Sequence, residues 1–504
     1  MQPSNVFATL THTSFLAWGR PSAYIPANAR KFIGTLSCVR GSVLGMSCHQ
    51  RKPLSEPPRP HPERTGKFSR LYYPLVLLLS PALLFLLAQQ QPRSAQASPQ
   101  QGEPSVSGPA PVQPPADAGL QPSKPGAPTG ALTQVPIGYL KQEVKRLIPL
   151  SRLHVEPEDY GIAGAEMALK DNNTTGRFTK QEFTLDVERV PIGSDAVPAL
   201  QKLRESGHHF ILVDAPAETL LRLSDSVKGK DVLLFNVRAE DEELRQEECR
   251  ANVLHTAPDR YMLADALAQY LVWKKWQRWL VVKGVFPEDL AYLDAIRRAA
   301  KRFGGTIVEE REYKETPGAR RSDTGEEQIQ QQMPTFTQGA PDYDVVIVAD
   351  EKEVFGPYLP YRTWDPRPVA GTTGLVAMSW HPAHEQWGAT QMQNRFERFA
   401  KRFMWPVDYQ AWIAVRAIGE GATRVRSGEV GPVSDYIRGK DFDLAAFKGQ
   451  KVTFRKWDGQ LREPILVTGP DLPVSISPQA GFLHQNTEVD TLGVDEPESK
   501  CKFK

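Results

Sequence analysis

Four polar residues closely follow short apolar segments in the middle of this 504-residue chain. They are Asp214, Asn236, Arg238 and Thr256. Together they offer a carboxylate, an amide, a guanidinium group and a hydroxyl, the kinds of donor and acceptor that orient a small molecule in a cleft. Arg238 suits a carboxylate or another oxyanion, because its planar guanidinium group donates two parallel hydrogen bonds. Binding of this kind needs no nucleophile and no general base.

Three further residues are candidates for the same site. Tyr160 lies near the start of a helix that apolar spacing predicts over Pro157–Asp171. Asp350 and Glu351 follow the apolar segment Tyr343–Ala349 and could face the same cleft from a second lobe. Alternatively, these two acids place negative charge at the N-terminus of the next segment. The predicted ligand-binding set is Tyr160, Asp214, Asn236, Arg238, Thr256, Asp350 and Glu351.

Structural roles are also open for residues of the first group. Thr256 and Asp259 could cap the helix that follows them, because short polar side chains accept hydrogen bonds from helix N-termini. Arg238 could form a surface ion pair with Asp241 or Glu242. The sequence leaves both interpretations open.

Motifs for other chemistry are weak. The chain has no G-x-S-x-G elbow, no G-x-G-x-x-G loop after a strand and no Walker loop, so we predict no catalytic residues, no enzyme and no cofactor. His381, His384 and Glu385 lie in one loop, but their spacing does not favour a metal. Three tryptophans within 273–279 flank basic residues, and their spacing favours packing against a sheet over stacking on nucleic-acid bases.

Strands and helices alternate from residue 134 onward. Apolar segments such as 209–213, 231–235, 278–283 and 343–349 read as buried strands, and amphipathic helices of 10–18 residues separate them. This order predicts β-α-β units with parallel sheets. About ten such strands are more than one doubly wound sheet holds comfortably, so we expect two lobes. A hairpin is expected at Asp458-Gly459.

The first 133 residues differ from the rest in composition. They carry 12 Lys and Arg against 4 Asp and Glu, whereas residues 134–504 carry 49 basic and 55 acidic residues. An acidic body argues against nucleic acid as the main partner. Nine prolines fall within 98–133, which predicts a flexible or polyproline-type linker.

An export signal is predicted inside this N-terminal part, which we divide into an extension with a signal or anchor over 1–97 and the linker over 98–133. Residues 71–88 form an uncharged apolar segment, basic residues precede it, and Ala95-Gln96-Ala97 resembles a signal-peptidase site. The alternative is an uncleaved membrane anchor, since 18 residues just reach the spanning length. We therefore place the protein in the periplasm, with an anchor to the inner membrane as the alternative, and we expect membrane contact only through this segment.

The cysteines indicate one disulfide. Cleavage after Ala97 removes Cys38 and Cys48 and leaves only Cys249 and Cys501, in a compartment where disulfides persist. We predict that these two are joined, which would tie the C-terminal tail to the first lobe. Two free thiols are the alternative.

Several longer stretches resemble a known family. They are Ile137–Leu140, Asp171–Arg177, Leu254–Pro258, Asp408–Trp412 and the ending from Asp490 to Cys501. With the order of elements, they resemble type I periplasmic solute-binding proteins of branched-chain amino acid ABC transporters, and more narrowly the subfamily associated with pyrroloquinoline-quinone (PQQ) dependent alcohol dehydrogenase systems. The resemblance covers roughly 134–504.

This resemblance implies an α/β fold with two doubly wound Rossmann-like lobes. The first lobe would comprise 134–257 with 406–504 as its C-terminal part and tail, and the second 258–405. It implies a solute-binding component of an ABC transporter that delivers a small organic molecule to a permease. The alternative is a non-transport sensor or accessory protein of a periplasmic quinoprotein dehydrogenase. The loops Asp214–Ala217 and Asn236–Arg238 lack the Ser/Thr-rich pattern typical of the family's amino-acid binders, which argues against a branched-chain amino acid as the solute.

Overall fold

The computed structural model describes residues 131–147, 155–315 and 328–504, all of which belong to the unit 116–504. The predicted apolar segment 71–88, the cleavage site at Ala97 and the linker up to residue 130 lie outside the described residues. Within the described ranges, no helix combines the length and the apolar character needed to cross a bilayer.

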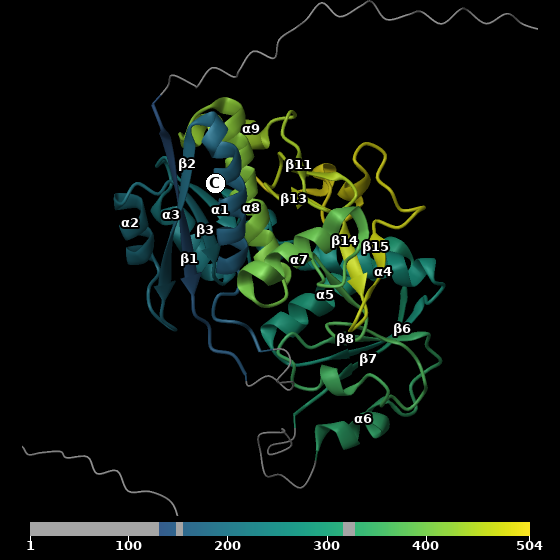
Figure 1. Cartoon of the computed structure of the whole chain (residues 1–504). Coiled ribbons are helices and arrows are strands. Elements are labelled where there is room, and N and C mark those ends of the chain that lie inside the picture. The colour runs from purple at the N-terminus through teal and green to yellow at the C-terminus, as the bar shows by residue number, and fades with distance from the viewer. Residues whose placement is uncertain (1–130, 148–154, 316–327) are drawn as a thin grey trace, which may run out of the picture. The chain divides into compact units, whose positions relative to one another are not determined.

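The first lobe is built on a five-stranded parallel sheet (Figure 1). Its strand order is β2-β1-β3-β4-β5, so the chain starts near one edge of the sheet and ends at the other. The inner strands Phe210–Asp214 and Leu233–Asn236 are fully buried because helices cover both faces of a parallel sheet, whereas the edge strand Gln181–Val190 is only partly buried. The strand bounds are β1 (Thr133–Gln142), β2 (Gln181–Val190), β3 (Phe210–Asp214), β4 (Leu233–Asn236) and β5 (Val253–His255).

Helices cover both faces of this sheet, as Figure 1 shows. One face carries α1 (Ile162–Thr179), α8 (Pro406–Val425) and α9 (Val430–Arg438), and α1 packs along α8. The other face carries α2 (Val197–Glu205) and α3 (Ala217–Ser226). Helix α8 follows the elements of the second lobe in the sequence, so the first lobe is built from two separate parts of the chain.

Helix α1 differs from the prediction at both ends. It begins at Ile162, five residues after Pro157, and it continues through Gly176 to Thr179. Gly176 therefore lies inside the helix. A Cβ at this position would lie 2.2 Å from the carbonyl oxygen of Gln181, so the glycine allows β2 to approach the helix. The helix ends at Lys180, whose backbone is left-handed.

The second lobe has a four-stranded parallel sheet in the order β7-β6-β8-β9. Helices α4 (Arg260–Trp273) and α5 (Pro287–Phe303) cover one face, and α6 (Ile329–Thr337) with a 3-10 turn (Gly356–Tyr358) covers the other. The strand bounds are β6 (Arg278–Lys283), β7 (Thr306–Glu312), β8 (Val345–Ala349) and β9 (Val369–Gly371). Two parallel sheets with separate cores confirm the predicted two-lobed α/β fold.

The return to the first lobe and the tail add two small antiparallel sheets. One has the order β10-β14-β15 and the other β11-β12-β13. Helix α7 (Ala389–Ala400) precedes α8. The strands are β10 (Val376–Met378), β11 (Leu444–Ala445), β12 (Lys451–Phe454), β13 (Leu461–Arg462), β14 (Ile465–Thr468) and β15 (Pro473–Ser477). Strands β12 and β13 form the expected hairpin around Asp458-Gly459, where Gly459 has a φ of 73°.

The packing departs from the predicted lobe boundaries in two places. Trp380 and α7 belong to the core of the first lobe, although they precede residue 406. Strands β14 and β15 follow residue 406, yet β14 pairs with β10, and both contact α4 of the second lobe. The physical reason is that Ile465 and Val467 bury their side chains in the core of the second lobe.

The connection between β4 and β5 departs from the alternation of strands with full helices. Residues Asp241–Glu248 contain only a 3-10 turn, Glu242–Arg245. The turn closes around the buried Arg245 guanidinium group, which donates hydrogen bonds to the carbonyl oxygens of Ala239 and Ala257. Of the three tryptophans within 273–279, Trp279 belongs to β6 and is fully buried in the core of the second lobe, whereas Trp273 is 51% exposed.

Candidate functional site

The carboxyl ends of β1, β3 and β4 bring five side chains together, which we call the Arg238 cluster: Tyr139, Glu156, Tyr160, Asp214 and Arg238. Arg238 donates from Nε to Asp214 and from Nη2 to Glu156, the latter at 3.0 Å. The Tyr139 hydroxyl donates to Asp214 at 3.1 Å. The Arg238 guanidinium carbon lies 5.5 Å from the centre of the Tyr160 ring. The structure thus brings Tyr160, Asp214 and Arg238 of the predicted set into one cluster.

The two acidic partners of Arg238 differ in their exposure. The Asp214 side chain is 1% exposed, whereas that of Glu156 is 21% exposed and also pairs with Arg146 and Lys141. Burial by itself would lower the pKa of Arg238, but Asp214 and Glu156 hold it above its usual range. Burial, reinforced by the Asp214 charge, raises the pKa of Tyr139 well above 10, so this hydroxyl stays protonated. Asp214 therefore fixes the Nε end of this guanidinium edge, whereas Nη2 on the same edge meets a partner that water can reach.

Asn236 and Thr256 shape the loop that presents Arg238. The Asn236 Oδ1 accepts from the backbone N–H groups of Arg238 at 3.1 Å and Ala239 at 2.8 Å, and its Nδ2 donates to the Ala239 carbonyl oxygen. The Thr256 hydroxyl donates to the Asn236 carbonyl oxygen at 3.2 Å. Both side chains are fully buried. They hold the turn after β4 and do not join the Arg238 cluster directly.

The acids after β8 have mainly local partners. Asp350 accepts hydrogen bonds from the backbone N–H groups of Val354, Phe355 and Gly356 at 3.0, 2.8 and 2.6 Å. This is the arrangement that the alternative interpretation of Asp350 expects. Glu351 accepts two hydrogen bonds from Arg260, at 2.6 and 2.9 Å. Asp350 therefore orders its own loop, while Glu351 binds the first residue of α4.

Arg260 links the two lobes. Besides Glu351 of the second lobe, it contacts Asp241 of the first lobe at 3.3 Å, and its backbone N–H donates to the Glu240 carbonyl oxygen. Burial, with the Glu351 charge as the next cause, raises the pKa of Glu240 to about 7. Burial and then the Asp259 charge raise the pKa of Glu242 to about 8. The acidic residues 240–243 therefore lie at the lobe boundary, and Arg260 is a cation close to them.

Sequence reasoning missed several of these residues. Tyr139 lies inside the β1 strand, Glu156 lies before α1, and Arg260 begins α4. Tyr139 carried no strand-end signal, because the apolar segment that contains it continues to Leu140 and β1 continues to Gln142. Nothing in the spacing indicated that Glu156 meets Arg238 or that Arg260 meets Glu351, because the members of these pairs are 82 and 91 residues apart in the chain.

The described cavities lie away from the predicted ligand residues. A hollow of about 400 Å³ is lined by His384, Trp387, Leu472 and neighbours, and one of about 580 Å³ lies beside Tyr313 and Phe336 in the second lobe. His384 donates from Nε2 to the Phe447 carbonyl oxygen at 3.1 Å. Among the residues that the structure describes, no group of three or more His, Cys, Asp or Glu side chains could hold a metal ion.

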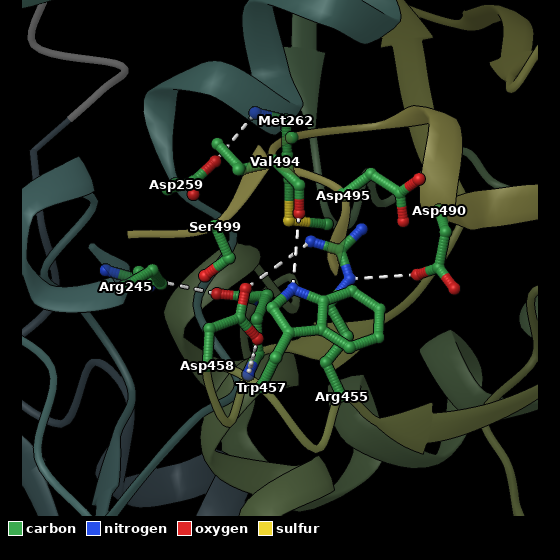
Figure 2. Close-up of polar contacts among 12 residues, drawn as sticks. Arg245, Asp259, Met262, Arg455, Trp457, Asp458, Asp490, Val494, Asp495 and Ser499 are labelled. Carbon is green, nitrogen blue, oxygen red and sulfur yellow. Dashed lines mark hydrogen bonds and ion pairs between the residues drawn. The ribbon is translucent and has the colours of Figure 1, made fainter. Parts of the chain in front are cut away.

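A second polar group, the crossing cluster, surrounds the segment 256–259 that leads from β5 to α4. Its members are Arg245, Arg455, Asp458, Gln460 and Asp490. Gln460 accepts a hydrogen bond from Arg245 at 2.9 Å and donates to the Ala257 carbonyl oxygen at 3.1 Å. Figure 2 shows Arg455 between Asp490, at 2.9 Å, and Asp458, at 3.9 Å.

Burial dominates the electrostatics of the crossing cluster. Burial lowers the pKa of Arg245 and raises that of Asp458 to about 6, although Arg455 opposes the second shift. The side chains of Arg455, Asp458 and Asp490 are 1%, 2% and 4% exposed. Such groups cannot exchange partners with solvent easily.

The structure joins Cys249 to Cys501 in a disulfide, with the two Cα atoms 5.6 Å apart. Cys249 lies in the loop between the Glu242–Arg245 turn and β5, so the bond ties the end of the chain to the first lobe. This is the pairing that the cysteine count predicts.

Comparison with known proteins supports the fold. The family model for periplasmic binding proteins matches residues 161–324. Among curated proteins, no match was found. A solved leucine-, isoleucine-, valine-, threonine- and alanine-binding protein from Brucella ovis is 13% identical, with 74% of this chain and 99% of that chain covered and a TM-score of 0.56.

Two other solved structures show the same likeness. A branched-chain amino acid ABC transporter ligand-binding protein from Burkholderia xenovorans is 15% identical, with 73% and 100% coverage and a TM-score of 0.56. A solute-binding protein of an ABC transporter from R. palustris, in complex with benzoate, is 11% identical, with 74% and 100% coverage and a TM-score of 0.51. The chain is therefore similar to type I periplasmic binding proteins in its fold.

Proposed function

We propose that residues 134–504 form the solute-binding component of an ABC transporter in the periplasm, and that the solute is a small organic molecule with an oxyanion such as a carboxylate. The single observation that carries this proposal is that Arg238 has one buried and one partly exposed carboxylate partner. Asp214 holds its Nε from the buried side, while its Nη2 faces the partly exposed Glu156. A solute carboxylate would take the place of Glu156, because Nη2 can donate a charge-assisted hydrogen bond to either carboxylate.

The local charge supports an anionic solute. Lys141, Arg146 and Arg238 all pair with the single carboxylate of Glu156, and Arg238 also pairs with Asp214. If a solute carboxylate displaced Glu156, that side chain would keep Arg146 and Lys141 as partners. The ligand-binding set therefore centres on Tyr160, Asp214 and Arg238, with Asn236 and Thr256 as positioning residues. Asp350, which orders its own loop, and Glu351, which pairs with Arg260, would act only as positioning residues from the second lobe.

A screen of thermal stability tests this proposal. The exported protein is heated with alcohols, aldehydes, carboxylic acids, amino acids and PQQ in turn. Binding at 100 times Kd stabilises the folded state by roughly 2.7 kcal/mol, so a true solute raises Tm measurably. We expect stabilisation by a carboxylic acid, and its loss in Arg238→Gln. Arg189→Gln is the matched control, because Arg189 pairs with the half-exposed Glu143 on the same side of the sheet. Stabilisation by no compound would contradict the proposal.

The second candidate is an accessory or sensor protein of a periplasmic PQQ-dependent alcohol dehydrogenase. The pairing of Arg238 also favours this second function. A guanidinium group with two carboxylate partners inside the protein has its hydrogen bonds satisfied without any solute. The resemblance to the PQQ-associated subfamily supports this link. The test is the alcohol dehydrogenase activity of periplasmic extracts with and without this protein. Unchanged activity together with lost solute uptake would favour the transport component.

A further inference from the structure

The chain end is anchored to the second lobe at Gly493. The Gly493 N–H donates to the fully buried Asp265 of α4 at 2.9 Å, and its carbonyl oxygen accepts from Arg298 and Arg302 of α5 at 2.8 and 2.5 Å. Leu492, the preceding residue, is buried in the core of the second lobe. Backbone and side-chain contacts thus fix this point of the tail to two helices.

Glycine is required at this anchor. Gly493 has a φ of 81°, which L side chains rarely adopt, and a Cβ there would lie 2.8 Å from Cγ of Met262. The backbone can approach α4 only without a side chain. The backbone of the tail is therefore in direct contact with the second lobe at this residue.

A second anchor holds the tail to the first lobe eight residues later. Cys501 is bonded to Cys249, whose side chain is fully buried. On either side, the Lys500 N–H donates to Gln246 at 3.0 Å, and the Lys504 N–H donates to the Cys249 carbonyl oxygen at 3.3 Å. The two anchors lie on different lobes, so the segment between them spans the lobe boundary.

The segment between the anchors runs beside the crossing. We call Leu492–Cys501 the C-terminal strap. Arg455 donates to the Leu492 carbonyl oxygen at 2.6 Å, and the Trp457 indole N–H donates to that of Val494 at 3.4 Å. Figure 2 shows Trp457 and Val494 facing each other next to Asp259 at the start of α4. The strap also contains a 3-10 turn, Glu496–Glu498, which shortens its reach.

We infer that the C-terminal strap limits how far the two lobes can open, and that the Cys249–Cys501 disulfide makes this limit permanent. Hinge opening moves the lobes relative to one another about a few crossing segments. Eight peptide steps span at most about 28 Å when fully extended, and the 3-10 turn and the contacts to Arg455 and Trp457 reduce this length. A strap of limited length beside the crossing, held by a disulfide at one end and by hydrogen bonds at the other, removes the most open conformations.

This inference goes beyond the proposed function and holds for the protein without solute. A strap that restricts the solute-free protein to fewer open conformations lowers the conformational free energy that closure around a solute costs. The competing possibility is that the tail only stabilises the fold. The two possibilities differ in one readout, the distribution of distances between the lobes in a folded protein.

The test is single-molecule energy transfer in the solute-free exported protein. Dyes are attached through non-natural amino acids at Glu205 of the first lobe and Lys301 of the second, both exposed. One variant is Cys249→Ser with Cys501→Ser. The other keeps the disulfide and inserts four Gly/Ser residues between Glu498 and Ser499, which lengthens the strap while retaining both anchors.

We expect both folded variants to show a longer mean distance and a wider distribution than the natural protein. A four-residue insertion at Gly229, an exposed turn of the first lobe, is the matched control and should leave the distribution unchanged. If the cysteine variant does not fold, the lengthened strap still decides the question. A natural distribution in the lengthened variant would overturn the inference, as would one in a folded cysteine variant. Because no solute is present, a failed solute screen would leave this result unaffected.

Discussion

The Arg238 cluster and the crossing cluster both pair arginines with acidic residues, but the two clusters differ in how far water can reach those acids. In the Arg238 cluster, one acid is buried and the other is 21% exposed, so one contact of the arginine can be exchanged. In the crossing cluster, the side chains of Arg455, Asp458 and Asp490 are all at most 4% exposed. Each charge there depends on its internal partner, because water cannot replace that partner.

The comparison shows that exposure, more than residue type, separates a binding role from a structural one. An arginine with a water-accessible partner can accept a solute at little cost. An arginine enclosed with its acids holds segments together, and losing one member leaves an uncompensated buried charge. The following predictions test this contrast, from the largest expected effect to the smallest.

Removing the disulfide should have the largest effect on stability. Cys501→Ser opens a covalent loop of 252 positions, and the chain-entropy model gives an upper value of about 5 kcal/mol for the loss in unfolding free energy. Urea unfolding of the oxidised natural protein and of the variant measures this difference. A thiol count on the denatured, unreduced mature protein is the control, and two free thiols would show that the bond does not form.

Asp490→Asn should cost about 3–5 kcal/mol of unfolding free energy. Asp490 accepts hydrogen bonds from both Arg455 and Arg462 at 2.9 Å, so the variant leaves cations without their anion in a buried place. Urea unfolding again measures the change. A loss below about 1 kcal/mol, the range of exposed ion pairs, would mean that the ion pairs of the crossing cluster contribute no more to stability than ion pairs on the surface.

The crossing cluster should also show a distinct pH dependence. Burial raises the pKa of Asp458 to about 6, from a usual value of 3.8. The folded state then holds this proton more tightly than the unfolded state. Its stabilising contribution is complete below pH 3.8 and is lost as the pH rises toward 6. The total loss is roughly 2–3 kcal/mol.

Asp458→Asn isolates this contribution, because the amide oxygen can still accept the Gln460 backbone N–H. We expect the unfolding free energy of the natural protein, minus that of the variant, to fall between pH 4 and pH 6. The measurement is urea unfolding at several pH values. A difference that stays constant or rises over this interval would contradict the raised pKa.

Glu156→Gln should have the smallest effect on stability, about 1 kcal/mol or less, because its side chain is partly exposed and its ion pairs are screened. It is the matched partner of Asp490→Asn, since both replace a carboxylate by its amide. Removing this competing charge from Arg238 should tighten binding of an anionic solute. Unfolding in urea and titration with the acid found in the screen measure the two effects. Weaker binding would show that Glu156 contacts the solute itself.

Much of the fold could be predicted from the sequence, because its signals are local. Continuous apolar runs such as Phe210–Val213 and Val345–Ala349 indicated buried parallel strands, and helical spacing placed most helices within a few residues. Asp214 and Arg238 were found because residues at the ends of neighbouring parallel strands share one edge of a sheet. Glu156 was missed because the segment before α1 carries no strand or helix pattern.

The sequence by itself determined the two-lobed α/β architecture, the strand-end candidates and the one possible pairing of the two cysteines that the predicted cleavage would leave. These follow from apolar periodicity, strand order and counting, which do not depend on distant contacts. Only the tertiary structure decided that Asp214 holds Arg238, that Gly493 sits on α4, and that the tail joins both lobes. Such contacts join residues tens to hundreds of positions apart, and their strength depends on burial, which exists only once the chain has folded.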